Sequence, residues 1–209
     1  MIRALVATLM LLAAATLARA EERPSIVVLG DSLVAGYQLA PGEGFPDRLQ
    51  AVMAERGVDI AVTGAGVSGD TTSGGLARLD WSVPAGTDGV ILELGANDML
   101  RGLPPATTRQ NLATMIERLQ ARGTEVLLVG MKAAPNMGPE FQAEFDAIYP
   151  ALAEEYGLLF DPFFLDGVTA VPDHLLADGM HPNATGVAVM ASRIAPLVEE
   201  FVGRLGPSP

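Results

Sequence analysis

The chain has 209 residues, and its 25 acidic and 13 basic side chains give a formal net charge of −12. A surface with this charge repels nucleic acid and anionic membranes, so we expect neither as a partner. The sequence has no cysteine and two histidines. It therefore supplies no thiol nucleophile, no disulfide and few metal ligands, and we expect no metal site.

The first twenty residues have the pattern of a secretory signal. Arg3 precedes an apolar stretch, and Ala18-Arg19-Ala20 is a small-x-small cleavage site. The apolar stretch is shorter than the roughly 20 apolar residues that a membrane-spanning helix needs. We predict that residues 1–20 are a signal peptide cut after Ala20, an uncleaved anchor being the alternative. Residues 21–209 would then form a single periplasmic or secreted domain without stable membrane insertion.

The rest of the chain alternates between short apolar runs and amphipathic stretches, punctuated by Gly and Pro. We predict strands at residues 25–29, 58–62, 89–94, 125–129 and 157–160. We predict helices over the apolar positions of residues 45–53, 112–119, 141–152 (kinked by Pro150) and 187–201. Short connections in this order predict an α/β fold, a parallel sheet with helices on both faces. The irregular stretch 162–182 is long for a compact domain, so we expect it to be functional.

Two polar groups follow predicted strands, where α/β sheets bind ligands. Gly30-Asp31-Ser32-Leu33 ends the first strand, which makes Ser32 a candidate nucleophile. The alternative is that Asp31 or Ser32 only caps a helical turn. Gly95-Ala96-Asn97-Asp98 follows the third strand, and the Asn97 carboxamide could donate to an oxyanion. The alternative there is an ordinary turn, since Asn and Asp favour turns.

A candidate base lies in Asp178-Gly179-Met180-His181-Pro182-Asn183. Residues three apart in a tight turn lie on one side, so Asp178 could bond one imidazole nitrogen of His181 and leave the other free to take a proton. The alternative is a solvated loop whose Asn183 caps the last helix. His174 is a second candidate base, but no acid lies three residues before it.

Gly64, Gly66 and Gly69 match the Gly-x-Gly-x-x-Gly fingerprint of dinucleotide sites. The match follows the second strand instead of the first, and the residues from Asp70 onward are a poor helix start. We therefore expect no nucleotide cofactor. A better use of Gly69 is to let its backbone N–H approach a substrate closely.

Four segments together resemble the conserved blocks of the SGNH (GDSL) hydrolases, in the family's order and across nearly the whole chain after the signal peptide. They are Gly-Asp-Ser-Leu at 30–33, Val-Ser-Gly-Asp-Thr-Thr at 67–72, Gly-Ala-Asn-Asp at 95–98 and Asp-Gly-Met-His-Pro-Asn at 178–183. The chain is similar to the exported arylesterase, thioesterase and lysophospholipase group. The resemblance implies a flavodoxin-like three-layer αβα sandwich and no cofactor. One departure is Gly64, where the family usually has Asn.

The resemblance also implies roles for the candidate residues. Ser32 would be the nucleophile and His181 the base, with Asp178 orienting the imidazole. The oxyanion hole would combine the backbone N–H groups of Ser32 and Gly69 with the side chain of Asn97.

We therefore expect a serine hydrolase that acts on small-molecule acyl esters or thioesters. An acyl-CoA thioesterase or lysophospholipase is the alternative within the class. A non-catalytic periplasmic binding protein and a nucleotide-binding oxidoreductase are the alternatives from other classes. Substrate selection is expected in the loops 131–138 and 163–176, through Met137 and Leu176. Phe163, Phe164 and Leu165 could instead fill the core.

Overall fold

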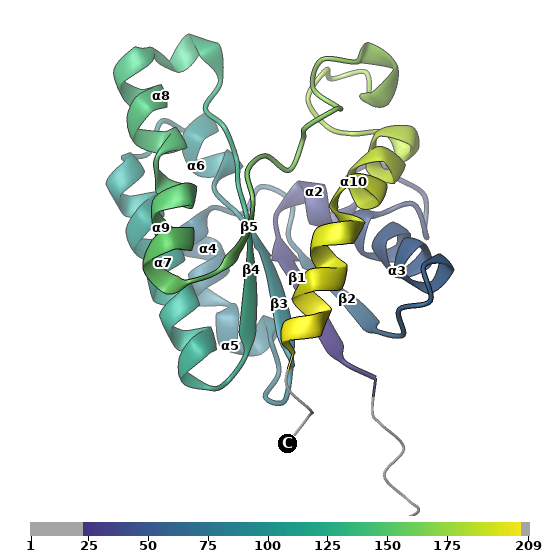
Figure 1. Cartoon of the computed structure of the whole chain (residues 1–209). Helices are drawn as coiled ribbons and strands as arrows, with labels where there is room; N and C mark the ends of the chain where they lie inside the picture. The colour runs from purple at the N-terminus through teal and green to yellow at the C-terminus, as the bar shows by residue number, and fades with distance from the viewer. Residues whose placement is uncertain (1–22, 206–209) are drawn as a thin grey trace, which may run out of the picture.

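Five apolar segments of the chain pair in parallel to form one sheet in a computed structural model that describes residues 23–205 (Figure 1). The strands are β1 (Ser25–Gly30), β2 (Ala61–Gly66), β3 (Gly89–Glu93), β4 (Glu125–Val129) and β5 (Leu159–Asp161), in the order β2-β1-β3-β4-β5. The five-stranded parallel sheet and the α/β class are confirmed. The predicted signal peptide lies outside the described residues.

Helices cover both faces of the sheet, as the αβα sandwich requires (Figure 1). One face carries α3 (Phe45–Glu55) and α10 (Ala184–Arg204), and the other carries α4 (Thr72–Ala77), α7 (Pro105–Ala121) and α9 (Ile148–Tyr156). The shorter elements are α2 (Ser32–Ala35), α5 (Leu79–Ser82), α6 (Ala96–Leu100), α8 (Pro139–Asp146) and the 3-10 turns η1 (Pro135–Met137) and η2 (Pro172–His174). Among the helices of residues 23–205, none has the length and apolarity to cross a membrane.

The strand order explains where a ligand can bind. The chain runs from β1 outward to β2, and then returns to place β3 on the other side of β1. The connections on either side of β1 therefore cover opposite faces, and they diverge above the carboxyl ends of β1 and β3. The segments that contain Ser32 and Asn97 follow these two strands.

Two strands begin later than predicted because the residue after a glycine completes the cap of the preceding helix. Gly57 has φ +78, and the N–H of Val58 donates to the carbonyl five residues earlier, at 2.9 Å. Gly157 has φ +66 and is followed by the same bond. Both are helix-ending motifs that use a left-handed glycine and an apolar residue after it. The strands consequently start at Ala61 and Leu159.

Two helix predictions were also wrong. The stretch 141–152 is not one kinked helix: α8 ends at Asp146 and α9 begins at Ile148. Pro150 has no N–H to donate to the carbonyl four residues back, so it fits in the first turn of a new helix. The supposedly poor helix start after Asp70 does begin a helix, α4, which the Thr71 side chain caps by accepting the Gly74 N–H at 3.3 Å.

Candidate active site

Ser32 lies where β1 gives way to α2, two residues beyond the last strand residue, Gly30. The turn is tight: a Cβ added to Gly30 would lie 2.3 Å from the Val34 side chain. Asp31 caps α2 by accepting the Leu33 N–H at 3.0 Å, so the capping interpretation of Asp31 is correct. It leaves the Ser32 hydroxyl uninvolved in the cap.

His181 and Asp178 form a compact unit on the turn before α10. One Asp178 oxygen accepts the backbone N–H groups of His181 (3.0 Å) and Met180 (2.9 Å), and the other lies 2.7 Å from His181 Nδ1. These bonds, chiefly the one from the His181 backbone, lower the pKa of Asp178 to about 2. An ionised carboxylate only accepts, so Nδ1 carries the proton and Nε2 is left as an acceptor.

The structure brings this unit to Ser32. His181 Nε2 lies 3.0 Å from Ser32 Oγ, within hydrogen-bond distance, although the residues are 149 positions apart. The ring of Tyr37 packs against the imidazole with centroids 4.4 Å apart. His174 is not brought to the site: its Nδ1 lies 3.1 Å from the Gly167 carbonyl oxygen.

Gly69 and Asn97, the two residues expected to supply oxyanion donors besides Ser32, border the same pocket as Ser32. Asn97 Nδ2 donates to Asp31 at 2.8 Å, which uses one amide hydrogen and leaves the second. Gly69 has φ +82, a conformation that glycine adopts without strain, and Arg101 donates to its carbonyl oxygen at 2.6 Å. The backbone of Gly69 is therefore fixed from the solvent side.

Two buried carboxyl groups beneath Ser32 were not predicted. Glu93, the last residue of β3, accepts the Asp31 N–H at 3.3 Å, and its other oxygen is buried without a hydrogen-bond partner in the described chain. Burial, and then the neighbouring Asp31 carboxylate, raise the pKa of Glu93 well above its usual range. Burial also raises the pKa of Asp31 to about 6, although Leu33 and Asn97 donate to it. The sequence signal was a glutamate inside an otherwise apolar strand.

Asp98 has a structural role that the sequence did not indicate. It is buried, and it accepts the backbone N–H (2.8 Å) and the hydroxyl (2.5 Å) of Thr72. These bonds tie the turn after β3, which contains Asn97, to the start of α4.

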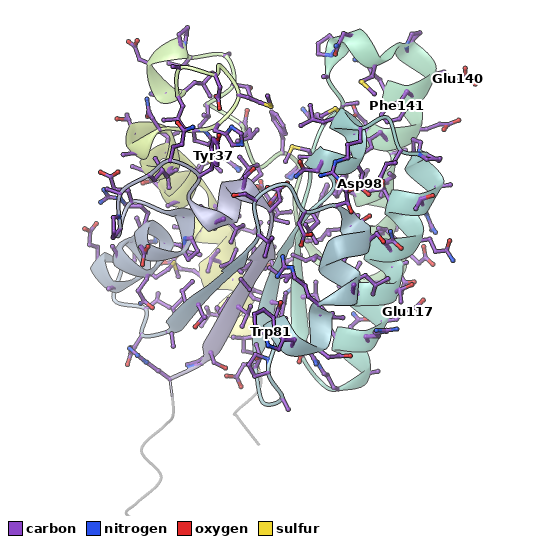
Figure 2. All side chains as sticks on the ribbon, turned by 180° about the vertical axis from the view of Figure 1, so that it is seen from behind. Tyr37, Trp81, Asp98, Glu117, Glu140 and Phe141 are labelled. Atoms are coloured by element: carbon purple, nitrogen blue, oxygen red, sulfur yellow. The ribbon has the colours of Figure 1, made fainter. Side chains whose placement is uncertain are left out.

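The pocket above Ser32 has a volume of about 740 Å³. Its apolar lining includes Met99, Leu100, Met131, Pro135, Phe163, Leu165 and Met180. Tyr37 also borders it, and Figure 2 shows this residue far from Trp81, which lies at the opposite end of the molecule.

The loops expected to select substrates do line this pocket, but not through the two residues named for that role. Met137 and Leu176 are absent from the lining. Phe164 is fully buried, edge-on to Phe45 at 4.7 Å, so the core interpretation is correct for it. Phe163, in contrast, faces the pocket.

The chain is also similar to known proteins in sequence and in fold. The model of the GDSL-like lipase/acylhydrolase family matches residues 28–189. The chain belongs to this family.

Relatives of the GDSL family protein include an arylesterase of Vibrio mimicus, 38% identical over 85% of this chain and 90% of the other. Another is the thioesterase 1/protease 1/lysophospholipase L1 of Escherichia coli K12, 35% identical over 88% of both chains. The crystal structure of AlinE4, an SGNH-hydrolase family esterase, is 44% identical, covers 86% of this chain and 97% of that one, and has a TM-score of 0.73.

The departure from the family pattern at Gly64 has a packing explanation in this GDSL protein. A Cβ at Gly64 would lie 2.8 Å from the Pro46 ring, so α3 occupies the space of a larger side chain. At Gly66 a Cβ would lie 2.3 Å from the Ala35 nitrogen of α2. These glycines of the apparent nucleotide fingerprint serve close packing of β2 against α2 and α3.

Proposed function

We propose that this protein is a serine esterase that hydrolyses carboxylic esters of small molecules through an acyl-enzyme on Ser32. The observation that carries the proposal is the hydrogen-bonded series from Ser32 Oγ through His181 to Asp178, which opens into a largely apolar pocket. A nucleophile, a base and a group that orients the base are what acyl transfer requires.

In the acylation step, His181 Nε2 takes the hydroxyl proton as Ser32 Oγ attacks the ester carbon. The Asp178 carboxylate stabilises the imidazolium that forms. His181 then returns the proton to the leaving alcohol. In deacylation, water attacks the acyl carbon while His181 takes one proton of the water. The bond between the acyl carbon and Ser32 Oγ then breaks, the carboxylic acid leaves, and His181 returns the proton to Oγ.

The developing oxyanion would be held by three donors that border the pocket. Asn97 has its second amide hydrogen, and the Ser32 N–H precedes the first intrahelical bond of α2. The N–H of Gly69 has no partner within residues 23–205. Donors fixed in advance stabilise charge without reorganising during the reaction.

A fluorophosphonate probe tests the proposal. It should label the wild-type protein at Ser32, located by mass spectrometry of the peptides, and Ser32→Ala should abolish labelling and turnover. Ser68 also lines the pocket, so Ser68→Ala is the matched control and should keep both. Labelling that persists in Ser32→Ala would refute the mechanism, and absence of labelling in the wild type would favour a non-catalytic binding protein.

Thioester or lysophospholipid hydrolysis is the second candidate. The apolar lining, about 740 Å³ in volume, supports it, as does similarity to a relative named for both activities. Rates on p-nitrophenyl esters, acyl thioesters and lysolipids of matched chain length would rank the three substrate classes.

Export is part of the proposal. A cut after Ala20 would release residues 21–209 as a single periplasmic domain, supported by the charge, apolar stretch and small residues of the N-terminus. Mass spectrometry of the protein from the periplasmic fraction should give Glu21 as the first residue. A first residue at any other position would contradict this cleavage site.

A further inference from the structure

The pocket of this acidic protein contains the side chain of its only lysine. The other twelve basic residues are arginines, yet Lys132, three positions beyond β4, lies in the wall of the pocket that contains Ser32. The surface as a whole repels anions because the formal net charge is −12. The pocket wall therefore carries a positive charge, whereas the surface as a whole is negative.

The Lys132 ammonium forms no salt bridge with any carboxylate of residues 23–205. Asp146, on α8, accepts the N–H of the adjacent Ala133 at 2.8 Å and forms no ion pair with Lys132. Lys132 Nζ instead lies 5.1 Å from the centroid of the Phe163 ring, which lines the same pocket.

The residues around Lys132 limit its freedom. Met131 is buried, and the Ala133 N–H is bonded to α8, so the backbone is held on both sides of the lysine. The Phe163 ring attracts the ammonium without cancelling its charge. Another cation, Arg101, already donates to the Gly69 carbonyl oxygen. Lys132 is thus an exposed cation in the pocket wall that lies beside Phe163 and has hydrogens left to donate.

We propose that Lys132 binds a negatively charged group, a carboxylate or phosphate, of the ester substrate. The inference rests on the proposed esterase function and adds a substrate class to it: esters in which an apolar segment separates the scissile carbonyl from an anion. The apolar segment would pack on Phe163 and its neighbours, and the ammonium would donate charge-assisted hydrogen bonds to the anion.

Two pairs of esters test the proposal and locate the anion. In the first pair, 4-acetoxybenzoate and its methyl ester, the charge is on the leaving group. In the second, mono-(4-nitrophenyl) adipate and its methyl ester, the charge is on the acyl group. For each pair the measured quantity is the ratio of kcat/KM on the anionic ester to kcat/KM on the neutral ester, which cancels differences in intrinsic reactivity between enzyme variants.

Lys132→Met removes the charge and keeps an unbranched apolar side chain beside Phe163. It should lower the ratio roughly three- to tenfold for at least one pair, the range between an exposed ion pair and a charge-assisted hydrogen bond. Rates on neutral esters should stay near those of the wild type. Lys132→Arg should keep most of the ratio, and added salt should lower the ratio of the wild type but not of Lys132→Met.

The matched control is Arg118→Met, which changes the net charge equally but lies on the exposed face of α7. It should leave both ratios unchanged. Ratios that Lys132→Met leaves unchanged in both pairs, or an equal loss on neutral and anionic esters, would overturn the proposal. If the wild type hydrolysed no neutral ester and Ser32 stayed unlabelled, the esterase function would fail first, and this inference with it.

Discussion

The buried Asp31 carboxylate makes the free energy of unfolding depend on pH. Its pKa is 3.8 in an ordinary environment and about 6 in this fold, so the folded protein binds the proton more tightly than the unfolded chain. Stability from this group is therefore complete below about pH 4 and is lost as the pH rises toward 6. The difference between a pKa of 3.8 and one of about 6 corresponds to a loss of about 3 kcal/mol.

Asp31→Asn should remove this loss because an amide does not ionise, while its oxygen can still accept the Leu33 N–H. At pH 8 the variant should be more stable than the wild type by up to about 3 kcal/mol, a rise in Tm of roughly 6–12 °C for a chain of this length. Below about pH 4 the two proteins should differ little.

The same substitution should impair catalysis. In the wild type Asn97 Nδ2 donates to Asp31. In the variant the new amide would direct its own hydrogens at Asn97 Nδ2, so two donors would face each other. Asn97 would rotate to present its oxygen there, and the oxyanion hole would lose a donor. We expect kcat to fall by about 10²–10³ with a small change in KM.

Denaturant unfolding at pH 4 and pH 8 tests the predicted effect on stability, and steady-state kinetics test the predicted effect on kcat. Asp161→Asn is the control: Asp161 is also buried, but it accepts hydrogen bonds at 2.6 and 2.7 Å from Arg193, so the variant should be destabilised at pH 8. A wild-type kcat in Asp31→Asn would show that Asp31 does not position Asn97. An Asp31→Asn variant less stable than the wild type at pH 8 would refute the electrostatic reasoning.

Three further predictions concern the turn, the glycines and the pocket. Asp178→Asn should lower kcat by about 10²–10⁴, because an amide can donate to His181 Nδ1 and hold the imidazole in the wrong tautomer; a kcat near that of the wild type would contradict the orienting role of Asp178. Gly66→Ala should reduce the free energy of unfolding by about 2 kcal/mol, because the added Cβ would clash with α2. Gly203→Ala is the control and should cause no such loss, because its Cβ would have no atom within 4 Å. Urea titrations measure both effects. Phe163→Ala should change the ratio of rates on long and short acyl esters and Met137→Ala should not; the opposite result would restore the sequence-based choice of Met137.

The sequence was sufficient for the layers of the fold because apolar periodicity reports burial directly. β4 was predicted with its exact ends, since its apolar run lies between two glycines, Gly123 and Gly130. Strand starts after Gly57 and Gly157 could not be placed this way. There an apolar residue closes the helix behind it, and its hydrophobicity does not distinguish that packing from a strand.

The site was predictable where its chemistry depends on short spacings. Asp178 and His181 are three apart, and their contact follows from one turn of chain. The buried contact of Asp31 with Glu93 was missed because it joins the residue after β1 to the end of β3, and no local pattern pairs the two. Met137 was chosen for its side-chain type, but which loop residues face the pocket depends on the path of the whole loop above β4.

The separation of Ser32 from the Asp178–His181 turn has a consequence for how the protein loses activity. The turn leads into α10, which the Arg193 pair holds to the end of β5 and the Arg56–Glu199 pair joins to α3. An opening that lifts this C-terminal segment would separate base from nucleophile while the strands stay hydrogen-bonded. During gentle heating, inactivation should therefore precede the loss of strand signal, and amides of α10 should exchange with deuterium before those of β1 and β3.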